Sequence, residues 1–142
     1  MKKAVVFLLF FNIFTVYSFS QETKTITVEI TNIVPGGGTV HMGVFFNAEE
    51  FKNEEPRYKF ELEDSGTVAA KTVTLPLGDY VITGFQDANN NKQMDYAFLR
   101  VPKELIAISN YNGKGIPTQN FDRQKVTVNS TTEKISVGLF KF

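Results

Sequence analysis

The stretch LPLGDYVITGF, residues 75–85, decides the fold of this chain. Its first part, Pro76 to Asp79, has the composition of a tight turn, because proline and glycine supply the backbone angles that such turns require. Its second part, Tyr80 to Phe85, has the strongest β-strand composition of the chain, since aromatic and β-branched residues fit a pleated surface. Residues 68–75, which precede the turn, also alternate in the manner of a strand. This stretch therefore predicts a tight turn that leads from one strand into the next.

The same period of two recurs on both sides of this stretch. In residues 25–31, Ile26, Val28 and Ile30 share one face while threonine and glutamate take the other, which is typical of a half-buried strand. The glycine-rich segment 34–38 then predicts a turn, and residues 39–46 are expected to form the second strand of this hairpin. Further strands are expected at residues 58–62, 124–128 and 134–140.

No helix of useful length is expected between these strands. Residues 48–55 fit either one helical turn or a loop, and prolines and glycines interrupt residues 96–122. About seven short strands with short turns predict an all-β fold, which we expect to be an antiparallel β-sandwich. A small barrel is the alternative.

The N-terminus has the pattern of a secretory signal peptide. Two lysines precede an apolar run from Ala4 to Phe14, and Ser18-Phe19-Ser20 offers small residues where a signal peptidase would cut. The apolar run is too short for a membrane-spanning helix, which needs about 20 residues. We therefore expect residues 1–20 to be removed and residues 21–142 to form a single domain with no membrane span. The protein is then exported, to the periplasm or to the extracellular space.

Composition excludes several classes of function. Fifteen basic residues balance fifteen acidic ones, so no basic excess favours nucleic acid as a partner. The absence of cysteine excludes disulfides and a thiol nucleophile, and a single histidine excludes a multi-histidine metal centre. That histidine, His41, lies among apolar residues of a predicted strand, where a packed or surface role is expected. No nucleophile motif of a serine hydrolase is present.

One polar loop has the spacing of a calcium site. It runs from Asp87 to Asp95, and oxygen-bearing side chains fall at alternate positions, as in loops that curl around a hard cation. The predicted metal ligands are Asp87, Asn89, Asn91, Gln93 through its backbone carbonyl, and Asp95. Glu104 supplies a third carboxylate if residues 99–102 fold back toward the loop. With few charged ligands, the affinity should be weak, with a Kd on the order of 10⁻⁴–10⁻³ M.

The same loop has a second interpretation as a hydrogen-bonded turn, in which Asn and Asp side chains cap backbone N–H groups. Lys92 stands where calcium loops usually have glycine, and Phe98 stands where they usually have glutamate. A third possibility, a hydrolase built on Asp87, Asp95 and Glu104, is weaker, because nothing else in the sequence singles out an acid pair.

The order of motifs resembles a known bacterial secreted family. The matching segments are Leu75–Tyr80, Gln86–Asp95, Pro102-Lys103-Glu104, Ser109-Asn110 and Pro117 to Phe121. They follow the pattern of the family called domain of unknown function 2141, over about residues 25–142. Three positions depart from that pattern: Gln86 replaces a histidine, and Lys92 and Arg100 replace glycines.

This resemblance implies a transthyretin-like or prealbumin-like sandwich and no known activity. Our leading hypothesis is an exported, non-enzymatic module with a weak calcium site in the Asp87–Asp95 loop and no other cofactor. The alternative is a module that binds carbohydrate or cell-wall fragments at the same end, with Tyr96 and Tyr111 as stacking platforms. The expected partners are accordingly a glycan or a protein of the cell envelope.

Overall fold

The computed structural model describes residues 20–63, 66–111, 113–115 and 117–141. The predicted signal peptide lies almost wholly outside the described residues. The elements in chain order are β1 (Thr23–Thr31), β2 (Thr39–Phe45), α1 (Ala48–Asn53), β3 (Tyr58–Leu62), β4 (Val68–Pro76), β5 (Gly78–Asp87), η1 (Phe98–Arg100), β6 (Leu105–Ile108), α2 (Phe121–Gln124), β7 (Val126–Val128) and β8 (Lys134–Phe140). The all-β prediction is confirmed.

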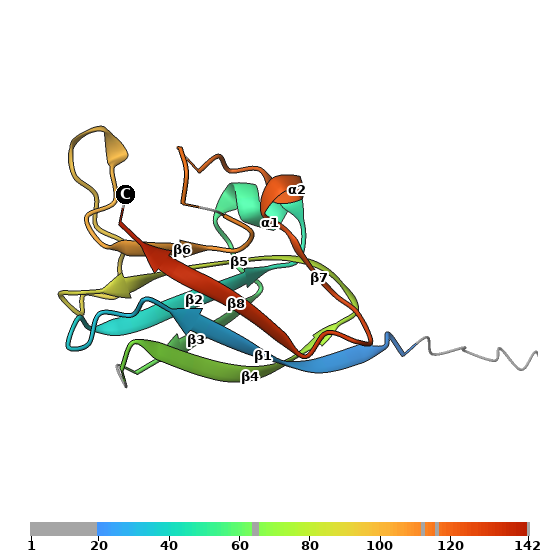
Figure 1. Cartoon of the computed structure of the whole chain (residues 1–142). Coiled ribbons are helices and arrows are strands. Elements are labelled where there is room, and N and C mark those ends of the chain that lie inside the picture. Colours follow the sequence, from blue (N-terminus) through green and yellow to red (C-terminus); the bar gives the residue numbers. More distant parts are fainter. Residues whose placement is uncertain (1–19, 64–65, 112, 116, 142) are drawn as a thin grey trace, which may run out of the picture.

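The strands of the described chain form one mixed sheet. Their order is β3-β2-β5-β6-β8-β1-β4, and β7 pairs with the first residues of β5. The two end strands, β3 and β4, also lie close to each other, so the sheet is nearly a barrel (Figure 1). The structure thus favours the barrel alternative, and neither a sandwich nor a transthyretin-like fold is confirmed.

One strand pair contradicts the expectation of a purely antiparallel sheet. The C-terminal strand β8 enters between β6 and β1 and runs parallel to β1, pairing Thr27 with Lys134 and Thr31 with Gly138. Parallel neighbours need a long connection, and nearly the whole domain lies between β1 and β8. No local pattern could reveal this pairing. The predicted hairpin of residues 25–31 and 39–46 is also wrong, because β1 pairs with β4 and β8 whereas β2 pairs with β3 and β5.

The main core fills the inside of the curled sheet. The predicted face of β1, Ile26, Val28 and Ile30, is fully buried there, and Ile82 of β5 and Leu139 of β8 pack into the same cluster. The alternation in β1 therefore predicted correctly which face of the strand packs into the core.

A second, smaller core lies on the outer face of the same sheet. Phe45 of β2 and Val81 of β5 pack there against Phe51 of α1, with Phe121 of α2 at the edge. Residues Ala48–Asn53 form a helix and not a loop, because the Asn47 side chain caps the first turn by accepting a hydrogen bond from the N–H of Glu50. Strand β5 is thus covered on both faces over part of its length.

The segment 96–122, expected to be irregular, contains β6, and α2 begins at its end and takes up Gln124, so that the strand predicted at residues 124–128 is only Val126–Val128. Strand β6 is only four residues long, Leu105–Ile108, and lies between β5 and β8. After it, the buried Ser109 hydroxyl accepts from the N–H of Ile82 at 2.9 Å and donates to the carbonyl of Gln124 at 2.7 Å. Ser109 therefore joins β5 to the segment that leads into β7, which gives the Ser-Asn motif a structural role.

Candidate functional site

The Asp87–Asp95 loop is organised around the buried carboxylate of Asp87, at the end of β5. Its Oδ2 accepts from the N–H of Lys92 at 2.7 Å and its Oδ1 from the N–H of Asn91 at 3.2 Å. Asn90 and Lys92 adopt left-handed backbone angles, with φ of 55° and 62°, and these angles turn the N–H groups inward. Burial alone would raise the pKa of Asp87, but these N–H donors, together with His41, hold that pKa below its usual value.

The other end of the loop gathers around Asp95. Its Oδ2 accepts from the side-chain amides of Asn89 at 2.6 Å and Asn91 at 3.1 Å. The buried Glu104 spans the two ends, accepting from the N–H of Ala88 at 3.0 Å and from that of Asp95 at 3.2 Å. Residues 99–102 do fold back, as the sequence analysis required for Glu104 to reach the loop.

The predicted calcium ligands lie around this one loop, where the structure shows many of their oxygen atoms accepting N–H groups. The Asn91 Oδ1, for example, accepts from the N–H of the exposed Gln93 at 2.8 Å. Within the described residues no group of three or more His, Asp or Glu side chains is placed to hold a metal ion. The loop has the hydrogen bonds of the turn interpretation, and the calcium site remains a prediction.

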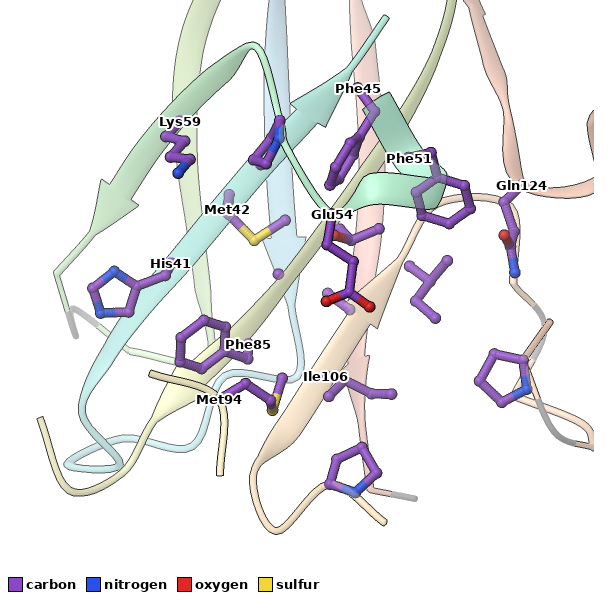
Figure 2. Close-up of a pocket in the computed structure, with 18 of the residues that line it drawn as sticks. His41, Met42, Phe45, Phe51, Glu54, Lys59, Phe85, Met94, Ile106 and Gln124 are labelled. Carbon is purple, nitrogen blue, oxygen red and sulfur yellow. The ribbon is translucent and has the colours of Figure 1, made fainter. Parts of the chain in front are cut away.

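A cleft of about 610 Å³ opens beside the loop, on the outer face of the sheet (Figure 2). Two cross-strand rows form its floor. Phe85 faces His41 of β2 and Ile106 of β6 in one row, and Thr83 faces Gly43 and Ile108 in the next. Gly43 lets Pro56 pack directly onto the second row, since a Cβ placed at Gly43 would lie 2.8 Å from the Pro56 Cβ. The helices α1 and α2 cover the neighbouring part of the same face.

Charged and polar side chains surround this floor. Glu54 follows α1, Lys59 and Glu61 belong to β3, and Lys92 comes from the Asp87–Asp95 loop. Figure 2 shows the Glu54 carboxylate directed over the middle of the floor, between Phe85 and Phe51. The cleft therefore combines an apolar base with a rim that carries both signs of charge, an arrangement typical of small-molecule sites.

His41 connects the cleft to the loop. Its ring stacks on Phe85 with 5.2 Å between centroids. Its Nε2 lies 3.4 Å from Asp87 Oδ2, and its Nδ1 lies 3.2 Å from Glu61 Oε1. Because the carboxylates hold both ring nitrogens, this geometry orients the ring as part of the cleft floor.

The two predicted stacking platforms have different surroundings. Tyr96 lines the cleft and is 46% exposed. Tyr111 does not line it: its ring packs on Phe140 at 4.6 Å, and its hydroxyl donates to the carbonyl of Gly115 at 2.6 Å. Only Tyr96 is therefore placed to contact a ligand in the cleft.

The cleft itself was not predicted from the sequence. A partial signal was present in β5, where Val81 and Phe85 place apolar groups opposite Ile82. A strand with apolar residues on both faces needs a cover on both, and here helices supply that cover over only part of the outer face. The remaining uncovered part is the cleft floor.

Fold and site together define a class: an all-β domain whose nearly closed sheet carries a ligand-sized cleft on its outer face. The family model described as "Uncharacterized protein conserved in bacteria (DUF2141)" matches residues 28–136. The chain belongs to this family, which confirms the resemblance drawn from the motifs. A search of curated proteins and a search of solved structures found no match. Across the described residues, no helix is long and apolar enough to cross a membrane.

Proposed function

We propose that this protein is an exported, non-enzymatic binding module whose cleft takes a small ligand of the carbohydrate or cell-wall class. The observation that carries the proposal is the cleft itself. Its volume of about 610 Å³ falls in the range of ligand pockets, roughly 300–1,000 Å³. The signal-like N-terminus supports export, and an exported protein meets the sugars of the cell envelope.

The lining chemistry favours a sugar over a wholly apolar ligand. A sugar ring has one less polar face, which packs on aromatic groups, and a periphery of hydroxyls, which need hydrogen-bond partners. The Phe85 and Tyr96 rings serve the first need. The rim side chains Glu54, Lys59 and Glu61 serve the second, because carboxylates accept from hydroxyls and ammonium groups donate to them.

The test is calorimetric titration with soluble peptidoglycan fragments and a panel of oligosaccharides. We expect Tyr96→Ala to weaken binding by about tenfold, since an aromatic contact is worth roughly 1 kcal/mol beyond its buried area. Tyr58→Ala is the matched control, because Tyr58 is exposed on β3 and does not itself line the cleft. Equal affinity of the Tyr96→Ala protein and the parent would place the ligand elsewhere. The absence of heat with every sugar would overturn the proposed ligand class.

Calcium binding by the Asp87–Asp95 loop is a second candidate, favoured by the folding back of Glu104 onto the loop. Binding adds RT ln(1 + [L]/Kd) to the free energy of unfolding, which is about 1.4 kcal/mol at ten times Kd. We expect about 5 mM calcium to raise the melting temperature of the full chain by several degrees over chelator, at the affinities of extracellular sites.

Asp95→Asn keeps the shape of the side chain and removes its charge, so this variant should lose most of the calcium-dependent rise. Magnesium is the ion control, because it prefers a smaller, octahedral shell. Identical melting curves in chelator and in calcium would leave the loop as a hydrogen-bonded turn alone.

A further inference from the structure

A short loop projects from the sheet next to the cleft and ends in two exposed apolar side chains. We define the tip loop as residues 96–102, which contain η1 (Figure 1). At its end, Phe98 is 86% exposed and Leu99 is 79% exposed, more than any other large apolar side chain described. Leaving both in water is unfavourable, so the tip needs an explanation that the folded domain does not supply.

The backbone holds the tip in this position. Tyr96 pairs with Pro102 in an isolated β-bridge. The N–H of Ala97 donates to the carbonyl of Val101 at 2.7 Å, and the N–H of Lys103 donates to the carbonyl of Asp95 at 2.9 Å. Leu99 and Arg100 both adopt left-handed backbone angles, with φ of 60° and 57°. Such angles are strained for residues other than glycine, and this strained turn presents Phe98 and Leu99 to the solvent.

The charged residues within the tip loop and directly after it are basic. Residues 96–103 contain Arg100 and Lys103 and no acid. Lys141 adds a third cation, because its ammonium group hydrogen-bonds the carbonyl of Lys103. The nearest acids along the chain, Asp95 and Glu104, already accept hydrogen bonds from loop amides. Glu54 lies near the Tyr96 ring at the base of the loop, and the Arg100 guanidinium lies 5.9 Å from the centroid of the same ring.

We infer that the tip loop is a membrane contact: Phe98 and Leu99 insert into the interfacial region of an anionic lipid bilayer while Arg100, Lys103 and Lys141 meet the lipid headgroups. Apolar side chains at a narrow tip suit the boundary between headgroups and acyl chains, and nearby cations add to the attraction. A protein partner would need about 800 Å² of surface from this side, far more than a two-residue tip offers. The inference does not depend on the ligand proposed for the cleft.

Fluorescence can test this directly, because the chain contains no tryptophan. Phe98→Trp places a single reporter at the tip, and Val68→Trp places one at an exposed apolar position on β4. Vesicles of phosphatidylcholine alone are compared with vesicles of equal parts phosphatidylcholine and phosphatidylglycerol. With the anionic vesicles, we expect a blue shift and quenching by brominated lipid for the Phe98→Trp protein, and neither effect for the Val68→Trp protein. If the emission of the Phe98→Trp protein is unshifted with both vesicle types, the proposal is overturned.

Co-sedimentation supplies the second measurement. Phe98→Ser/Leu99→Ser should reduce binding to the anionic vesicles by at least about tenfold, because burial of each large side chain contributes more than the roughly 1.4 kcal/mol that a tenfold change requires. Its melting temperature should equal that of the parent, since both side chains are exposed. All variants keep the same N-terminal residues, so any difference arises at the tip. Binding equal to that of the parent would assign membrane affinity to another surface and overturn the proposal.

Discussion

Replacing Asp87 with alanine should lower the free energy of unfolding by about 3 kcal/mol, because an unsatisfied N–H group costs about 1–3 kcal/mol. The carboxylate is fully buried and accepts from the N–H groups of Asn91 and Lys92. Alanine leaves the N–H of Lys92 without its acceptor, and it leaves the N–H of Asn91 with Asn89 Oδ1 alone, at 3.1 Å. It also removes one of the two carboxylates beside the His41 ring. In a domain of this size the loss corresponds to a fall in melting temperature of about 10 °C, measured by circular dichroism.

The matched control is Asp95→Ala at the other end of the same loop. Asp95 is only partly buried and accepts from the side-chain amides of Asn89 and Asn91, which can turn toward water instead. Its replacement should cost less than about 1 kcal/mol. Equal losses for the two variants would show that the loop depends on its acidic charge and not on the buried hydrogen bonds of Asp87.

Acid titration gives the same prediction a second readout. The pKa of Asp87 is lower in the folded chain than in the unfolded one, where it is about 3.9. Its ionised form therefore stabilises the fold above the unfolded pKa, and this contribution is lost as the pH falls through the folded pKa. The Asp87→Asn variant lacks this contribution. The difference in free energy of unfolding between parent and variant should therefore be constant above about pH 5 and become smaller below it. Glu29, Glu50 and Asp79 also have lowered pKa values, which is why the difference between two proteins is measured.

Gly38→Ala should be comparably harmful, with a loss of about 2–5 kcal/mol in the free energy of unfolding, since left-handed strain costs about 1–2 kcal/mol and overpacking another 1–3. Gly38 has a φ of 92°, and a Cβ atom placed there would lie 1.9 Å from the carbonyl oxygen of Asp87. The obstacle is backbone, so it cannot turn aside as a flexible side chain would. The alanine variant should separate the turn before β2 from the end of β5 and lower the melting temperature accordingly.

Gly36→Ala is the internal control from the same turn. Gly36 has a similar left-handed φ of 73°, but nothing lies within 4 Å of a Cβ placed there. Its replacement should cost only the backbone strain, about 1 kcal/mol. Chemical denaturation of both variants separates strain from collision. If they lose the same free energy, the close approach of Gly38 to Asp87 has no energetic role.

Much of the local structure follows from the sequence alone. The alternation of Ile26, Val28 and Ile30 predicted both a strand and its buried face, because a period of two places alternate side chains on one side of a sheet. The Asp87–Asp95 spacing predicted a curled polar loop, since Asn and Asp accept hydrogen bonds from nearby backbone groups and tolerate left-handed angles. The family membership was also readable, because the loop and the short motifs after it occur in a specific order.

Only the tertiary structure decided which strands pair and where the site lies. Strand β6 has just four residues, too few to establish a period. The parallel pairing of β1 with β8 joins segments at opposite ends of the domain sequence. Short sequence patterns do not show which distant segments will pair. The cleft floor brings together Gly43, Thr83 and Ile108 from three strands. Local sequence determines the conformation and buried face of a segment, whereas long-range packing decides which faces remain uncovered and can bind.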